Sequence, residues 1–188
     1  MNRKRWLAAA LLAGAAPATA QEMVPLPKFK SIELNGGGSV LLRHGPVQRV
    51  TIRSGSTQFT EMRVSGRDRR LVIDACNARC PRRYDLKIEI VTPEVEAVSV
   101  NGGGEIAAAG GFPRQASVAA AVHGGGEIDL RALPVREAAA AVDGGGRLLV
   151  RPDESLAAAV NGGGEILYWG DPEVASSIDG GGVVRKGS

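Results

Sequence analysis

The chain has 188 residues, 26 glycines, only 4% aromatic residues and a formal net charge of +3 at pH 7, so it fits a single domain with a core of small aliphatic side chains. The positive excess belongs to the first 20 residues, which hold Arg3, Lys4 and Arg5 and no acid; the rest has 20 basic residues (23 minus 3) against 20 acidic ones. This balance gives no support to nucleic-acid binding, which needs a basic surface, and we expect no nucleic-acid partner.

Residues 1–20 have the three parts of a secretory signal peptide. A basic start is followed by an apolar run over residues 6–16 and by the small-x-small sequence Ala18-Thr19-Ala20. The run is too short for a membrane-spanning helix, which needs about 20 residues. We therefore predict cleavage after Ala20 and export to the periplasm, the cell surface or the medium. We expect no transmembrane segment in the mature chain, residues 21–188.

Residues 28–94 are expected to form the first coil of the domain and a β-rich cap. A first strand runs from Phe29 into the glycines 36–38, and residues 49–53, 70–74 and 84–91 alternate between polar and apolar side chains, as strands do. Six arginines cluster here: Arg67, Arg69, Arg70, Arg79, Arg82 and Arg83. This cluster either is a solvated surface or meets the anionic groups of a polysaccharide or phosphate.

Two cysteines, Cys76 and Cys80, lie in the sequence Cys-Asn-Ala-Arg-Cys. In an exported chain such a pair predicts a disulfide. A metal site would need more thiol or imidazole ligands, and only His44 and His123 are present in the whole chain. We expect the bridge to fix a turn, and we expect neither a metal nor a cofactor.

The remaining chain, residues 95–184, is dominated by a repeat built on three consecutive glycines. From Asn101 onward the motif recurs at spacings of 22, 20, 18 and 18 residues, the length of one coil of a repeat protein. Glycine allows the backbone angles of a sharp turn and lets stacked turns approach closely. We expect all three glycines to be required in each turn, and a β-branched residue at Gly125 to destabilise the protein. The turn glycines are Gly36, Gly37, Gly38, Gly102, Gly103, Gly104, Gly124, Gly125, Gly126, Gly144, Gly145, Gly146, Gly162, Gly163, Gly164, Gly180, Gly181 and Gly182.

The residues that flank these glycines predict strands. Counted from the residue that precedes the three glycines, such as Asn101, apolar side chains recur one position before it and five and seven positions after it. This is the period-two pattern of a half-buried strand. The alanine runs 119–121, 138–141 and 157–159 share this register, so we expect strands there despite their helix propensity. Coils in identical register stack in parallel and align their apolar residues. The predicted fold is therefore all-β: a right-handed parallel β-helix, or solenoid, with a β-rich N-terminal cap region.

The glycine turns, the first strand Phe29-Lys-Ser-Ile-Glu-Leu-Asn-Gly and the segment Leu86-Lys-Ile-Glu-Ile-Val-Thr-Pro resemble the putative auto-transporter adhesin, head GIN domain family. The resemblance covers about residues 28–184. It implies a right-handed β-helix in an exported bacterial protein, with an adhesin function assigned by analogy.

Parallel stacking would bring equivalent side chains of successive coils about 4.8 Å apart. The residues before the glycines would form a polar ladder, which either satisfies the turns or provides a His123–Asp143 base or a cation site; we favour the structural role. The residues after the glycines, from Ser39 onward, would form a charged ladder with either simple charge compensation or a carboxylate pair for glycoside cleavage. Tyr168 and Trp169 either cover an open core end or stack on a sugar. The predicted interaction surface comprises Glu105, Glu127, Arg147, Glu165, Tyr168 and Trp169.

These observations predict a non-enzymatic structural or interaction module of the bacterial cell envelope, adhesin-like, whose partner is an envelope protein or a polysaccharide. The alternative is a carbohydrate-binding or carbohydrate-active β-helix protein. The last coil, residues 174–184, leaves a core cross-section for which the following residues offer little cover. We therefore expect self-association through the C-terminal coil.

Overall fold

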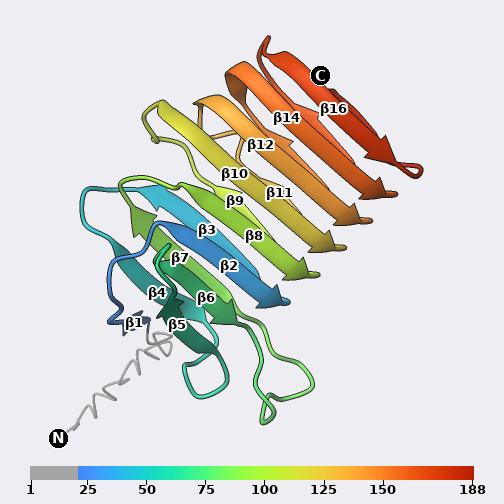
Figure 1. Ribbon diagram of the computed structural model, residues 1–188. Helices are drawn as coiled ribbons and strands as arrows, with labels where there is room; N and C mark the ends of the chain where they lie inside the picture. The colour runs from blue at the N-terminus through green and yellow to red at the C-terminus, as the bar shows by residue number, and fades with distance from the viewer. Residues whose placement is uncertain (1–20) are drawn as a thin grey trace, which may run out of the picture.

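A computed structural model describes residues 21–188 of the chain. These residues form seventeen strands in two sheets, with no helix among them, and the predicted all-β class is confirmed (Figure 1). This described part contains no helix that is long and apolar enough to cross a membrane. The predicted signal peptide, residues 1–20, lies outside the described residues.

The strands divide into a nine-stranded sheet A and an eight-stranded sheet B. Sheet A contains, in spatial order, β1 (Glu22–Val24), β4 (Arg49–Ser54), β7 (Lys87–Thr92), β3 (Ser39–His44), β9 (Glu105–Ala108), β11 (Glu127–Asp129), β13 (Arg147–Val150), β15 (Glu165–Tyr168) and β17 (Val183–Lys186). Sheet B contains β16 (Glu173–Asp179), β14 (Pro152–Gly162), β12 (Val135–Gly144), β10 (Gln115–Gly124), β8 (Ala97–Gly102), β2 (Ser31–Gly36), β6 (Arg70–Asp74) and β5 (Glu61–Ser65).

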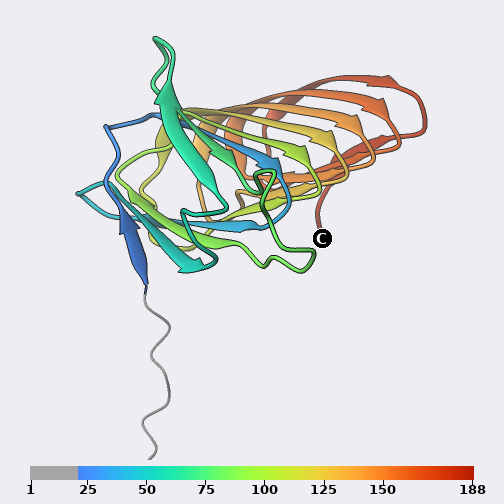
Figure 2. The ribbon, with the colours of Figure 1, turned by 90° about the horizontal axis from the view of Figure 1, so that it is seen from below.

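The triple glycines join the two sheets. Each repeat contributes one strand to sheet B and, after its glycines, one strand to sheet A, and we call such a pair of strands a coil. Neighbouring coils pair in parallel and in the predicted register: Val122 of β10 lies between Val100 of β8 and Val142 of β12, and Ile128 of β11 lies beside Ile106 of β9. Figure 2 shows the sheets as two layers connected by the turns.

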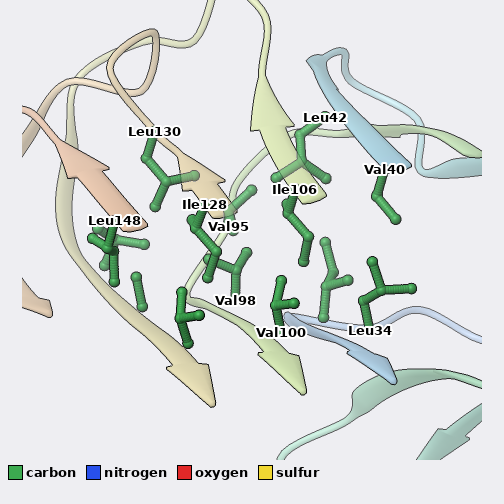
Figure 3. Packing of buried hydrophobic residues seen from close by; sticks show 14 of the residues in the cluster. Leu34, Val40, Leu42, Val95, Val98, Val100, Ile106, Ile128, Leu130 and Leu148 are labelled. Atoms are coloured by element: carbon green, nitrogen blue, oxygen red, sulfur yellow. The ribbon is translucent and has the colours of Figure 1, made fainter. Parts of the chain in front are cut away.

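The core lies between the two layers and consists of ladders of aliphatic side chains. Leu34 and Val100 of sheet B face Ile106 and Ile128 of sheet A (Figure 3), and all four are fully buried. The stacked register aligns each apolar position with its equivalent in the next coil, so a chain with few aromatic residues still builds a continuous core.

The alanine runs form strands, as predicted. Ala120, Ala140 and Ala158 occupy equivalent positions in β10, β12 and β14 and point into the core, where they are buried. The residues that precede them, Ala119 and Ala139, are exposed, which is the alternation of a strand. Ladder pairing with identical neighbours on both sides therefore outweighs the helix propensity of alanine.

The order of the coils in space departs from their order in the chain at the N-terminal end. The coil of β2 and β3, which we expected to be the first of the stack, lies between the β8–β9 coil and a coil of β6 and β7. The β6–β7 coil lacks the glycine motif. Beyond it, β4 pairs antiparallel with β7, β5 with β6 and β1 with β4, and these three strands form the predicted β-rich cap.

Residues 75–86 take the place of the glycine turn in the β6–β7 coil. The strand before them ends at Asp74, which is the register partner of Asn35. The predicted disulfide between Cys76 and Cys80 is present in this loop. The hydroxyl of Tyr84 lies 2.8 Å from the hydroxyl of the buried Thr60, which also bonds to the carbonyl of Ala75 at 3.1 Å. These bonds fix the loop against the cap.

The three glycines of each turn are not equivalent, and the prediction for Gly125 is wrong in its reason. The first glycine of the turn, Gly124, has a φ of +113°, which an L side chain rarely adopts. A Cβ on the third glycine, Gly126, would lie 2.6 Å from the carbonyl oxygen of Gly104 and 2.6 Å from Cγ1 of Val100. Gly125 has no positive φ, and a Cβ added there would meet no atom within 4 Å. A Cβ on any other middle glycine would also meet no atom within 4 Å, and none of these glycines has a positive φ. Neither a close contact nor the backbone angle therefore explains why glycine occupies the middle position.

Candidate functional site

The polar ladder predicted before the glycines is present where the strands of sheet B end, next to the glycine turns. Asn35 donates a hydrogen bond to Asp74 at 2.7 Å, Asn101 donates to Asn35 at 2.8 Å, and Asn161 donates to Asp143 at 3.0 Å. The hydrogen bond from the Asn35 amide, together with Arg63 and against a smaller opposing effect of burial, holds the pKa of Asp74 below its usual value. Asn35 and Asn161 thus bind a carboxylate of the adjacent coil, and Asn101 binds the amide oxygen of Asn35.

His123 and Asp143 are neighbours in this ladder, with 3.8 Å between Nδ1 and the carboxylate. Their side chains are 55% and 59% exposed. The outward-facing residues beside them on the same strands are Ala121 and Ala141, which carry no nucleophilic group. This geometry fits the structural role that we favoured for the ladder.

The charged ladder after the glycines lies on the outer face of sheet A. Arg147 is 3.8 Å from Glu127 and 3.1 Å from Glu165, and Arg185 is 2.7 Å from Glu165 on its other side. The predicted charge compensation is therefore present for the carboxylates of Glu127 and Glu165. Glu105 is the register partner of Glu127 and extends the same row.

Tyr168 and Trp169 do not cover the open end of the core, so that expectation is wrong. Tyr168 belongs to β15, the strand before the edge strand β17, where Lys186 is its register partner, and it packs partly buried against the core. Trp169 follows it on the side away from the glycine turns. The guanidinium of Arg131 lies 5.1 Å from the centre of the Trp169 ring, and the backbone of Gly187 packs against the indole. The indole is thus engaged by this chain's own residues.

A second surface, which the sequence analysis missed, is the outer face of sheet B. It carries a hollow of about 900 Å³ whose floor is formed by small side chains of successive coils. We call this surface the alanine face; its residues are Ala97, Ser99, Ala119, Ala121, Ala139, Ala141, Ala157, Ala159, Ala175 and Ser177. It is bordered by His123 and the polar ladder on one side and by Glu137 and Glu173 on the other.

The alternation in sheet B differs from that of an ordinary surface sheet. Strands with one wet face alternate apolar and polar residues, whereas strands covered on both faces read as continuous apolar runs. β10, β12 and β14 have runs of the second kind, yet among residues 21–188 other elements cover only their inner faces. Alanine at the outward positions 119, 121, 139 and 141 was the signal that could have identified this face from the sequence.

The arginine cluster is divided among β6, the turn before it and the loop after it. Arg70 pairs with Glu33 at 3.0 Å, and Arg69 donates to the carbonyl of Lys28 at 3.0 Å. Arg79, Arg82 and Arg83 lie on the disulfide loop. Among residues 21–188 there is no group of three or more His, Cys, Asp or Glu side chains placed to hold a metal ion.

Comparison with known proteins supports this architecture. The sequence pattern of the family described as "Putative auto-transporter adhesin, head GIN domain" matches residues 28–116 and 114–172. The chain belongs to this family.

Among solved structures, this family member is similar to a putative adhesin from Bacteroides fragilis, with 18% identity over 92% of this chain and 100% of that one and a TM-score of 0.55. A putative adhesin from Parabacteroides distasonis aligns with 15% identity over 89% of this chain and 96% of that one, with a TM-score of 0.45. The likeness to the Bacteroides protein shows a shared fold. No curated protein matches the chain.

Proposed function

We propose that this family member is an exported, non-enzymatic module of the bacterial cell envelope that binds another macromolecule through its alanine face. This proposal rests on one observation: sheet B has the apolar outward side chains of a sheet that is covered on both faces, yet none of residues 21–188 covers its outer face. Exposed, contiguous apolar surfaces of this kind mark interaction sites. The adhesin names of the family and of the Bacteroides structure support the same role.

The proposal also assigns the architecture. We infer that the stacked coils form a right-handed parallel β-solenoid, because the coils pair in parallel and right-handed connections are the general preference for parallel strands. A solenoid exposes long, rigid outer faces, and its regular ladders suit contact with an extended partner. No cofactor enters the proposed function.

The test compares two outward-facing alanines, one on each sheet. A141R places a long charged side chain in the middle of the alanine face, whereas A107R places the same side chain on the outer face of sheet A. Binding of the labelled protein to intact bacterial envelopes should be saturable, should fall at least about tenfold with A141R and should be unchanged with A107R.

Equal binding by both variants would reject the alanine face as the binding surface. A glycan array and a reducing-sugar assay, run in parallel, address the carbohydrate alternative. Saturable binding to a glycan that A141R leaves intact, or release of reducing ends, would favour that alternative and contradict the proposal.

A further inference from the structure

The two sheets both end at the last coil, and this end is built differently from the cap. Among residues 21–188, β16 and β17 each have a neighbouring strand on one side only, so the other side presents unpaired backbone groups. At the cap end, β1 has three residues and β5 carries the charged Glu61 and Arg63. Short or charged edge strands resist further pairing. β16, with seven residues, lacks the first of these protections.

The core columns also end uncovered in the last coil. Ile178 is 46% exposed, whereas its register partner in the preceding coil, Val160, is 2% exposed. Val174 is 36% exposed, against 1% for its partner Leu156. Val184, the partner of the fully buried Ile166, is only partly buried. The apolar positions that are buried inside the stack are thus exposed in the last coil, where no further coil of the described residues covers the end of the core.

We propose that two copies of this chain associate through their last coils, with β16 of each copy pairing antiparallel with β17 of the other. Ile178 and Val184 lie at equivalent distances before and after the last glycine turn and both point between the sheets. A two-fold axis parallel to the strands and midway between the sheets therefore brings Ile178 of one copy against Val184 of the other. Both sheets then continue through the contact, and both core ends are covered.

Charge selects this arrangement over the other two-fold solution. An axis normal to the sheets would pair β16 with β16, which places Glu173 opposite Asp179 of the second copy. Pairing β16 with β17 in the register of Ile178 against Val184 instead places Arg185 diagonally beside Asp179, within reach of its long side chain. Like charges directly opposite one another destabilise a strand pair, and opposite charges stabilise it. The second copy thus fits this end in charge, strand direction and apolar register.

This inference does not depend on the proposed function, because the dimer contact is at the end of the stack, between the sheets, whereas the alanine face, which includes Ala175 and Ser177 of β16, is the outer face of sheet B. The first test is sedimentation of the protein, purified after export, over a concentration series. The expected mass rises from one chain to two and no further. A strict monomer at high concentration, or masses that grow beyond two chains, would overturn the proposal.

Matched variants locate the contact. I178K/V184K puts two charges into the proposed core contact, and we expect it to weaken the dimer at least about 100-fold. V183K changes an exposed valine that points to the outer face of sheet A, and the dimer should persist. Far-UV circular dichroism and a melting curve establish that each variant is folded. A folded I178K/V184K variant that still dimerises would contradict the contact.

A cross-linking experiment tests the register with cysteine substitutions, which add no charge to the core contact. It does not depend on whether the lysine variant folds. The two native cysteines are already paired with each other. Chains with I178C and chains with V184C are given different tags, mixed and oxidised. Directly opposite side chains on antiparallel strands are close enough to form a disulfide. We expect a mixed disulfide dimer joining positions 178 and 184. A disulfide dimer formed by S176C alone would instead indicate β16 against β16 and overturn the proposed arrangement.

Discussion

An alanine scan of one turn separates the three glycines that the sequence presents as equal. In G126A the new Cβ would lie 2.6 Å from the Gly104 carbonyl oxygen, which already accepts a hydrogen bond from the amide of Glu127 at 3.0 Å. It would also lie 2.6 Å from Cγ1 of Val100, a fully buried side chain. Neither neighbour can move without disturbing the ladder of the preceding coil, so the substitution overpacks a tight site.

The expected magnitudes follow from these contacts. Overpacking a core costs about 1–3 kcal/mol, and two close contacts place G126A near about 3 kcal/mol of lost stability. G124A forces alanine into a φ of +113°, with strain of about 1–3 kcal/mol. G125A meets nothing within 4 Å and reduces the freedom of the unfolded chain, so it should be neutral or stabilising by up to about 1 kcal/mol.

Urea unfolding and calorimetry of the three variants, at one protein concentration, measure these differences. For a domain of this size 1 kcal/mol corresponds to about 2–4 °C in Tm, so G126A should melt about 6–12 °C below the parent protein. G125A serves as the matched control one residue away. The reasoning fails if G125A loses as much stability as G126A, or if G126A loses less than about 1 kcal/mol.

Three further predictions concern the ladders and the cap. N35A removes the amide whose hydrogen bond lowers the pKa of Asp74, so the Asp74 pKa should rise in a carbon-13 titration, and an unchanged value would contradict the assignment. The stability that this carboxylate contributes is present above its unfolded pKa and is lost as the pH falls through its lower folded pKa. R147A removes a partly exposed partner of two carboxylates and should cost less than about 1 kcal/mol, decreasing with added salt; a larger, salt-independent loss in urea unfolding would show a packing role. Protein exported through an oxidising compartment should show no thiol under denaturing conditions, whereas two titratable thiols would refute the Cys76–Cys80 bridge.

The repeat made most of the coil stack predictable. Once the glycine motifs are aligned, the apolar residues on either side, such as Val122 and Ile128, have to coincide in neighbouring coils, and this alignment specifies strands, parallel pairing and register together. It also explains how the alanine run 138–141 could be assigned to a strand, because the same positions in three consecutive coils have to adopt one conformation.

The β6–β7 coil could not be placed in the same way, because it lacks the motif. It resembles a repeat in its two strands: Leu71-Val-Ile-Asp74 has the apolar spacing of Ile32-Glu-Leu-Asn35, and Ile88 and Ile90 match the apolar positions after the glycines. That likeness predicts a strand of the same kind, but it does not say on which side of the β2–β3 coil the strand lies. In the structure β6 lies against β2, where Arg70 contacts Glu33 and Asp74 contacts Asn35, and these contacts between distant segments do not follow from the motif.

The alanine face shows a further limit of sequence patterns. Alternation assigns one face of a strand to the core, and in β12 this correctly buries Ala138, Ala140 and Val142. The same pattern leaves Ala139 and Ala141 at outward positions, where their small size has no effect on the core. Stacking of the coils requires apolar side chains only on the inner face of each strand. The stability of the coil therefore does not explain why the outer face is apolar as well. That apolar character is explained if the outer face of sheet B is covered by a partner, and A141R against A107R distinguishes that requirement from a tolerance for small residues.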